Sequence, residues 1–348
     1  MAHLPTSVPT NFSTTAVNKD HNSTNGTDCP LEKSEEWMAI YIWLIAVLGI
    51  VFNVFVLTVF YLHKKAFTVA EIYLSNLAAA DLVLVSCLPF WAVNATHNYK
   101  WPFGDHLCRL VNLGINMNAC CSIYFLVLIV MDRYVALVHP LSHDRFRRPK
   151  FAKLCCLLVW GFGLLLGVPI LYFREVKGHH CHINYPNDTI HLLCEGILII
   201  FKFILPISII TWCTVKIIQA LKNRSVEGLN TQQNTDHKAT TLVLVVLVAF
   251  LICWVPFHLI KILVSLQAVE ILKGCDLQAI LHICNQIFTY LAFFNSVLNP
   301  ILYIIVGKNF QKKVQELFSQ QSIRRTTILS LTSTRSNLIS SVRANDVC

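Results

Sequence analysis

The chain has 348 residues, of which 55% are hydrophobic and only 14% are charged. Soluble domains usually carry about 25% charged residues, so this composition indicates a membrane protein. The formal net charge of +9 is better explained by membrane topology than by nucleic-acid binding, and we expect no nucleic-acid partner.

Seven long apolar stretches follow one another along the chain, separated by polar loops. They lie at about residues 37–62, 69–95, 105–138, 151–172, 192–221, 239–266 and 279–306. Each exceeds the roughly 20 residues that a helix needs to cross about 30 Å of hydrocarbon. We therefore predict an all-α membrane protein, a seven-transmembrane helix bundle over residues 37–306.

Lysine and arginine are concentrated after the first, third, fifth and seventh spans. These residues are Lys64, Lys65, Arg145, Arg147, Arg148, Lys150, Lys222, Arg224, Lys308, Lys312 and Lys313. The opposite set is sparser: Lys33, Lys100, Arg174, Lys177 and Lys273. The positive-inside rule then predicts an extracellular N-terminus and a cytoplasmic C-terminus in the plasma membrane. The first span is expected to act as its own signal and anchor.

The N-terminal segment, residues 1–36, is polar and is predicted to be an extracellular glycosylated tail. Four acceptor motifs for N-glycosylation fall on the side predicted to be outside. Their asparagines are Asn11, Asn22, Asn25 and Asn187. The agreement of these motifs on one side of the membrane is more informative than any single motif.

Four of the 14 cysteines lie outside the predicted spans: Cys29, Cys108, Cys181 and Cys275. An even number in an oxidising compartment suggests two disulfides, and four cysteines allow three pairings. A bond between Cys108 and Cys181 would pin the loop after the fourth span over the helix bundle. Cys29 with Cys275 would then tie the N-terminal tail to the last outer loop. The cysteines within the spans are interpreted as small apolar packing residues.

One acidic residue, Asp81, lies in the middle of the second span. An isolated carboxylate at the bilayer centre costs at least ~2.5 kcal/mol, so it needs a cation, a proton or polar partners. Other spans offer such groups, namely Asn53, Asn118, Ser122, Asn295, Ser296 and Asn299. A carboxylate with amide and hydroxyl oxygens suits a hard cation, and a single charge favours sodium. The alternative is a hydrated hydrogen-bond network around a protonated Asp81.

Two spans contain proline-centred breaks, at Pro256 and Pro300, which are expected to bend their helices and to serve as hinges. After the seventh span, apolar residues recur at helical spacing, which predicts a short amphipathic membrane-surface helix over residues 307–319. Residues 320–348 are rich in Ser and Thr and are expected to form a disordered, phosphorylatable cytoplasmic tail.

Several motifs occur one per span and in order. They are Asn53, the stretch from Leu77 to Asp81, Asp-Arg-Tyr at 132–134, Trp160, Pro206, Cys-Trp-Val-Pro at 253–256 and Asn-Pro-Ile-Leu-Tyr at 299–303. Together they resemble the rhodopsin-like (class A) G-protein-coupled receptors over roughly residues 30–320. Within that class, TVAEIYLSNLAAADL, LPFWA, WPFG and LNPILYIIVGKNFQKKV are most similar to the kinin (bradykinin) receptors.

The resemblance implies an activation mechanism. Arg133 would be held by Asp132 and, in the resting state, by Asp236 at the base of the sixth span. The other switch positions implied are Tyr134, Ile123, Pro206, Phe250, Trp254, Asn299, Pro300 and Tyr303. The polar group around Asp81 would be an allosteric sodium pocket. Thr214 departs from many class A receptors, which have a tyrosine there.

Two exclusions narrow the ligand implied by the resemblance. Phe293 replaces the retinal-binding lysine of opsins, and Ile115 replaces the aspartate of amine receptors, which argues against both classes. An outer tail tied back by a second disulfide fits a peptide receptor better. The expected contact residues are Trp91, Ile115, Asn116, Arg174, Phe257, His258, Gln286 and Phe293. Arg174 is suited to a peptide C-terminal carboxylate. The aromatic residues are suited to apolar peptide side chains; for Trp91 and Phe257 the alternative is ordinary packing within the bundle.

Kinin receptors usually carry acidic residues at the outer ends of the sixth and seventh helices, where this chain has Val264 and His282. An angiotensin or chemokine receptor is therefore kept as an alternative. The kinin resemblance further implies coupling to a Gq-class G protein with calcium release, and binding of receptor kinases and arrestin to the tail. A transporter or a membrane enzyme is disfavoured, because we find neither internal repeats nor histidines and acids at metal-ligand spacing.

Overall fold

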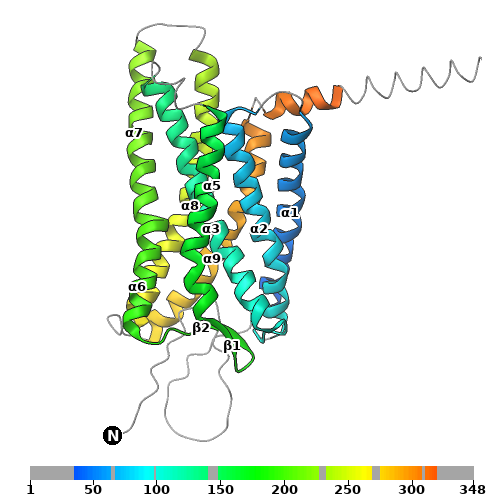
Figure 1. Ribbon diagram of the computed structural model, residues 1–348, viewed down its shortest axis with the longest axis vertical. Coiled ribbons are helices and arrows are strands. Elements are labelled where there is room, and N and C mark those ends of the chain that lie inside the picture. Colours follow the sequence, from blue (N-terminus) through cyan, green and yellow to red (C-terminus); the bar gives the residue numbers. More distant parts are fainter. Residues whose placement is uncertain are drawn as a thin grey trace, which may run out of the picture.

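The computed structural model describes residues 35–63, 67–97, 99–139, 148–226, 233–268, 275–307 and 310–319. Within these residues, seven helical stretches are long and apolar enough to cross a membrane. They stand side by side as a bundle (Figure 1). The predicted seven-helix membrane fold is therefore confirmed.

The helices lie close to the spans predicted from hydropathy. They are α1 (Glu35–Leu62), α2 (Val69–Thr96), α3 (Gly104–Val138), α5 (Pro149–Phe173), α6 (Asp188–Ile199), η2 (Ile200–Ile204), α7 (Leu205–Val226), α8 (Gln233–Ala268) and α9 (Cys275–Val306). The fifth span consists of α6, η2 and α7 in succession. A further short helix, over residues 310–319, follows α9, as the apolar spacing in this segment predicted.

Local sequence explains where several helices begin. Thr68 caps α2: its hydroxyl accepts a hydrogen bond from the backbone N–H of Glu71, and the Glu71 carboxylate accepts one from the N–H of Thr68. This reciprocal capping box satisfies two backbone donors that would otherwise lack partners. Pro149 lies in the first turn of α5, where its missing N–H has no cost. Asn187 caps α6 by accepting from the N–H of Ile190.

The fifth span contains a π-helical turn, η2, that hydropathy did not predict. Such a turn inserts one extra residue and rotates the flanking helical segments relative to each other by about 100°. The hydroxyl of Tyr124, on α3, donates to the backbone carbonyl of Phe201 in this turn, at 2.8 Å. A side chain from a neighbouring helix thus satisfies a backbone acceptor where the helical pattern is interrupted.

The loop after α5 forms a short antiparallel hairpin of β1 (Arg174–Lys177) and β2 (His180–Ile183). Its two connecting residues both have positive φ, 59° at Gly178 and 66° at His179. This conformation matches the twist of a two-residue hairpin, and it is unusual for a histidine. The hairpin is an addition to the all-helical prediction, which treated this segment as a loop.

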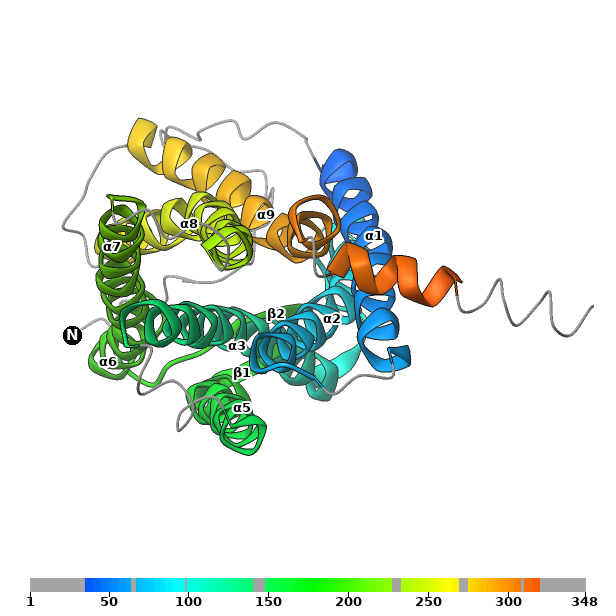
Figure 2. The ribbon, with the colours of Figure 1, turned by 90° about the horizontal axis from the view of Figure 1, so that it is seen from above.

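The third span lies at the centre of the bundle and the fourth lies at its edge. In the membrane-spanning part of α3, 72% of the residues in its most apolar stretch are buried inside the protein, whereas only 28% are buried in the corresponding stretch of α5. Figure 2 shows α5 outside α3, at the rim of the bundle. Large apolar side chains of α5, such as Leu157 and Leu158, point outward and are exposed, as expected for residues that face lipid.

Small residues let the helices approach closely. A Cβ atom added to Gly49 on α1 would lie 2.4 Å from Val85 Cγ1 on α2, and one added to Gly167 on α5 would lie 2.3 Å from Leu113 Cδ1 on α3. At such distances a larger residue would force the neighbouring side chain to move. Helix association in lipid relies on such close packing, because burial of apolar surface gives little driving force there.

The helix over residues 310–319 packs across the bundle at the end opposite the hairpin (Figure 1). Lys313 forms an ion pair of 2.8 Å with Glu71, and Glu316 forms one of 2.9 Å with His63. The ring of Phe310 is buried against Phe60, with ring centroids 5.5 Å apart. These contacts attach the short helix to the ends of α1 and α2.

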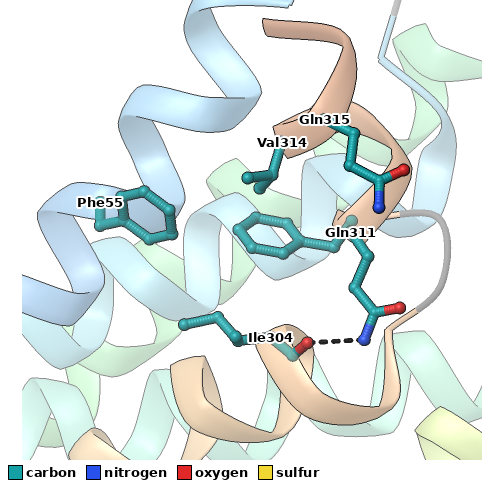
Figure 3. A pocket seen from close by; sticks show the side chains of 6 residues that line it. Phe55, Ile304, Gln311, Val314 and Gln315 are labelled. Carbon is teal, nitrogen blue, oxygen red and sulfur yellow. Dashed lines mark hydrogen bonds between the residues drawn. The ribbon is translucent and has the colours of Figure 1, made fainter. Parts of the chain in front are cut away.

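A mostly apolar pocket of about 230 Å³ lies between α1, α9 and this short helix. Figure 3 shows Phe55, Ile304 and Val314 around it. The side-chain amide of Gln311 donates to the carbonyl oxygens of Ile304 and Ile305, at 2.8 and 2.9 Å. Carbonyl groups in the last turn of α9 thereby gain side-chain partners.

Candidate functional site: the outer end and the buried polar core

The disulfide between Cys108 and Cys181 is present, as proposed from the sequence, with its Cα atoms 5.8 Å apart. It joins β2 to the first turns of α3. Two further contacts hold the hairpin in place: Asp105 accepts from the N–H of Val176 at 3.0 Å, and the N–H of Trp101 donates to His179 at 2.7 Å. Cys29 and the side chain of Cys275 lie outside the part of the chain that the structure describes, so their pairing stays a prediction.

The hairpin places Arg174 at the end of the bundle opposite the helix over residues 310–319. Arg174 is 5% exposed, and its Nε and Nη2 atoms donate to the sulfur and the carbonyl oxygen of Cys181, at 3.4 and 3.5 Å. Burial lowers the pKa of Arg174 to about 9, which leaves it cationic at neutral pH. Burial and the nearby Glu195 raise the pKa of Tyr185, whose hydroxyl donates to that carboxylate.

An aromatic stack on α8 lies deeper in the bundle. Trp254 stacks on Phe250 at 5.7 Å and on His258 at 5.9 Å, and Phe257 meets Trp254 edge-on at 5.6 Å. Across the bundle, Phe203 of η2 stacks on His258 with centroids 4.9 Å apart. The structure thus brings together Phe257, His258 and Trp254 of the predicted residues.

Asn116, on α3, faces the fifth span. Its side-chain oxygen accepts a hydrogen bond from the ammonium group of Lys202 on η2, and both residues are less than a tenth exposed. Lys202 was not predicted as a site residue from the sequence, and neither was Lys261 on α8, whose ammonium group lies 5.8 Å from the centre of the Phe257 ring. The sequence does contain a signal for both residues, because each is a cation within a predicted span, and such residues mark functional sites.

Other predicted ligand residues lie elsewhere. Trp91 is 1% exposed and packs on Trp101 at 5.9 Å, beneath the hairpin. Phe293 is 5% exposed and belongs to a packed cluster with α1 and α2 residues, while Ile115 is partly buried beside that cluster. Gln286 is hydrogen-bonded to His282 on its own helix, at 3.1 Å. The structure gives Trp91 and Phe293 clear packing roles.

The polar residues around Asp81 form one buried cluster. The amide nitrogens of Asn118 and Asn299 donate to the two oxygens of the Asp81 carboxylate, each at 3.0 Å, and Asn118 also donates to Ser122 at 3.1 Å. The amide oxygens of Asn295 and Asn299 are buried without a hydrogen-bond partner. Carboxylate, hydroxyl and unpaired amide oxygens form a donor set that fits a small hard cation.

Asn53 connects the first helix to this cluster. Its amide nitrogen donates to the backbone carbonyls of Gly49 and Ser296, at 2.9 and 2.8 Å. Tyr303, one turn below Asn299 on α9, is 1% exposed, and its hydroxyl is buried without a partner. Four helices, α1, α2, α3 and α9, therefore contribute polar groups to the middle of the bundle.

The C-terminal end of α3 carries the charged pair that the sequence singled out. Arg133 contacts Asp132 at 3.2 Å, with side chains 13% and 4% exposed. Tyr134 packs on Trp212 of α7 at 4.9 Å. Ile123 and Phe250 are each 2% exposed and belong to the same packed cluster, and Pro206 is also buried. The side chain of Asp236 lies outside the described part of the chain, so its contact with Arg133 stays a prediction.

The comparison with known families agrees with this geometry. The family model described as "7 transmembrane receptor (rhodopsin family)" matches residues 52–303. This match covers well over half of the chain, and the protein therefore belongs to the rhodopsin family of seven-transmembrane receptors. It is a multi-pass membrane receptor by class, rather than a member of an enzyme family.

Individual relatives narrow the class. The chain is 43% identical to the human B2 bradykinin receptor over 332 residues, which cover 90% of this chain and 85% of the relative. It is 46% identical to the B2 bradykinin receptor of Cavia porcellus, with 80% and 77% covered. The B1 bradykinin receptor of Tupaia minor is 37% identical, with 88% and 90% covered. Within the rhodopsin family, the chain is thus a member of the bradykinin receptor group.

Proposed function

We propose that the protein is a cell-surface receptor that binds a kinin-like peptide at its outer end and activates a Gq-class G protein, with release of calcium. The observation that carries the proposal is the 43% identity to the human B2 bradykinin receptor across 90% of this chain. The geometry supports it, since the hairpin is tied to α3 by a disulfide, and aromatic and polar side chains of α3, η2 and α8 meet within the bundle.

The proposed orientation has α1 beginning outside the cell and the helix over residues 310–319 in the cytoplasm. The distribution of Lys and Arg supports it. The disulfide and the exposed Asn187, next to the hairpin, lie at the same end, which suits an oxidising, glycosylating compartment. Glycosylation of Asn11, Asn22, Asn25 and Asn187, and recruitment of receptor kinases and arrestin by residues 320–348, are parts of the same proposal.

Peptide binding is proposed to use Asn116, Arg174, Phe257 and His258 first. Ile115 and Gln286, which lie apart from these four, are proposed to contact another part of the peptide. The aromatic side chains are suited to apolar peptide residues, and Arg174 to a carboxylate. Trp91 and Phe293 pack against neighbouring side chains, and they are proposed to support the residues that contact the peptide.

Signal transfer is proposed to follow from a shift in population, because a ligand favours whichever state it binds more tightly. Movement of Trp254 would be passed to the packed Ile123, Pro206 and Phe250, and then through Asn299, Pro300 and Tyr303 to the inner end. There, Arg133 would leave Asp132 and Asp236 and meet the G protein. Contacts that form in one state and break in another provide the two-state element that such a switch needs.

A sodium ion is proposed to stabilise the resting state at Asp81. The unpaired oxygen of Asn299, whose amide nitrogen donates to Asp81, fits it together with Ser122 and the Asp81 carboxylate, and Asn295 is proposed as a further donor. In this role Asn118 positions the carboxylate by donating to it. A bound cation would neutralise the negative charge of the buried Asp81 carboxylate, because a buried charge without an opposite charge nearby is costly.

The proposal is tested by calcium mobilisation in transfected cells. The panel contains kinin, des-Arg-kinin and angiotensin peptides, and untransfected cells serve as the control. A response to a kinin at sub-micromolar concentration is expected, and blockade by a Gq inhibitor is expected to abolish it. Silence toward all kinins at micromolar concentration, at normal surface expression, would overturn the ligand assignment.

A further inference from the structure

The pocket between α1, α9 and the helix over residues 310–319 has mostly apolar walls. The residues that line it are Phe55, Ile304, Phe310, Gln311, Val314 and Gln315. The ring of Phe55, on α1, meets the ring of Phe310 edge-on with centroids 6.2 Å apart. Figure 3 shows Phe55, Ile304 and Val314 around the space. We call it the α1–α9 pocket, and the helix over residues 310–319 the short helix.

The walls of the α1–α9 pocket offer few hydrogen bonds to a bound water. The side-chain amide of Gln311 already donates to the carbonyl oxygens of Ile304 and Ile305. The carbonyl oxygen of Tyr303 accepts from the N–H of Gly307 at 3.0 Å. A buried water needs two to four polar partners, whereas apolar cavities stay dry and take up apolar molecules. The chemistry of the walls therefore favours an apolar occupant.

The size of the pocket suits a piece of hydrocarbon chain. Its volume is about 230 Å³. An apolar cavity of about 150 Å³ is large enough for benzene, so by proportion this pocket takes about nine carbon atoms. That is a stretch of one acyl chain, whereas the fused rings of a sterol need more room.

The depth of the pocket places it within the hydrocarbon layer of a membrane. The 28 residues of α1 form a helix about 42 Å long, which exceeds the hydrocarbon thickness of about 30 Å by about 12 Å. If α1 projects equally at both ends, about 6 Å lies outside at each end. Phe55 is about 10 Å from the end of α1 at Leu62. A lipid would therefore reach the pocket with its acyl chain rather than with its headgroup.

The helix faces beside the pocket are covered by lipid in a membrane. Val51 and Val54 on α1 are 55% and 46% exposed, and Ile305 on α9 is 66% exposed. Exposed apolar side chains of a membrane-spanning bundle face the acyl chains. The chain that follows the short helix starts with Gln-Gln-Ser-Ile-Arg-Arg, which is too polar for such a pocket. Lipid is thus the apolar molecule that adjoins it.

We propose that the α1–α9 pocket binds one acyl chain of a membrane phospholipid, drawn from the leaflet that borders the short helix. The acyl chain would contact α1, α9 and the short helix together, and would hold the short helix against the bundle. The exposed Lys312 of the short helix offers a cation to the phosphate at the membrane surface, which a sterol lacks. This inference goes beyond the proposed function and does not depend on which peptide the receptor binds.

The first test is photo-crosslinking of the full-length receptor in nanodiscs that contain phospholipid with a diazirine in the middle of one acyl chain. Peptides that contain Phe55 or Ile304 are expected to carry several times more label than the α5 peptide with the exposed Leu157. The two regions are at comparable depth, because Leu157 is about 12 Å from the start of α5. Equal labelling of all lipid-facing peptides would overturn the proposal.

Variants that fill the pocket should lose this excess of label. Val314→Phe places a larger side chain in the pocket, and Val215→Phe makes the same change at an exposed position of α7. A second pair avoids any effect on folding: Gln315→Trp at the exposed edge of the pocket, with Ser319→Trp at the exposed end of the short helix as its control. Val314→Phe and Gln315→Trp should lose the label and both controls should keep it. Undiminished labelling of the filled variants would refute the site.

Competition identifies the occupant. Excess phospholipid without the diazirine is expected to displace the label from the pocket peptides, and cholesterol or a free fatty acid at the same concentration is expected to displace it less. Stronger displacement by cholesterol or by the fatty acid would contradict a phospholipid occupant. Crosslinks that join two receptor copies through these peptides would show that a second copy covers the pocket, and would equally overturn the proposal.

Discussion

Removal of the Cys108–Cys181 disulfide should destabilise the receptor and loosen its outer end. The bond closes a loop with a sequence separation of 73 residues. In the chain-entropy treatment, closing a loop of that length stabilises the folded state by about 4 kcal/mol. That figure is an upper value here, because α3 and α5 retain their helical backbone in lipid even when they separate.

The assay is thermal unfolding of the purified receptor in detergent. The double variant Cys108→Ser/Cys181→Ser is expected to melt up to about 5 °C below the wild type, given roughly 1.4 °C per kcal/mol for a chain of 348 residues. Cys284→Ser, at a half-buried free thiol of α9, is the matched control and should change the midpoint little. Reducing agent should lower the wild-type midpoint toward that of the double variant.

Reduction also bears on the second predicted disulfide. If Cys29 pairs with Cys275, reducing agent should lower the midpoint of the double variant further, and a Cys275→Ser change should remove that residual effect. A wild-type midpoint that does not respond to reduction, or a double variant as stable as the wild type, would contradict the reasoning about the hairpin.

Two further predictions concern the core and the inner end. Asp81→Asn should abolish stabilisation of the folded receptor by sodium. In sodium chloride at ten times the dissociation constant, the wild type should be about 1.4 kcal/mol more stable than in choline chloride. An equal gain in stability for the variant would refute the cation site. Asp132→Ala and Asp236→Ala should raise basal signalling, measured as inositol phosphate accumulation at matched surface expression. Unchanged basal and stimulated signalling in both variants would exclude the proposed contacts of Arg133.

The membrane spans were predictable because lipid imposes a strong rule. Backbone polar groups must be satisfied within each span, so long apolar stretches have to be helices, and the bounds of α2 and α3 lie within a few residues of the predicted spans. Asp81 and its partners were also predictable, because a buried carboxylate requires nearby polar groups. The sequence correctly identified polar residues on several spans as candidate partners, and in the structure Asn118 and Asn299 donate hydrogen bonds to Asp81.

Other features depend on contacts that sequence alone does not reveal. The four-residue strands of the hairpin are too short for a periodic signal, and the positive φ of His179 is set by its surroundings. The π-turn at η2 carries no recognisable pattern, yet it directs Lys202 toward Asn116. Trp91 is suited equally to a ligand surface and to packing, and only its contact with Trp101 shows which role its environment provides.

The most direct test of the central claim is equilibrium binding of labelled bradykinin to membranes from cells that express the receptor, because binding does not depend on which G protein is present. Saturable binding at nanomolar to sub-micromolar concentration, displaced by unlabelled kinin and not by angiotensin, is the expected result. Displacement by angiotensin or by a chemokine with higher affinity, or no saturable bradykinin binding at normal surface expression, would contradict the assignment of this protein as a kinin receptor.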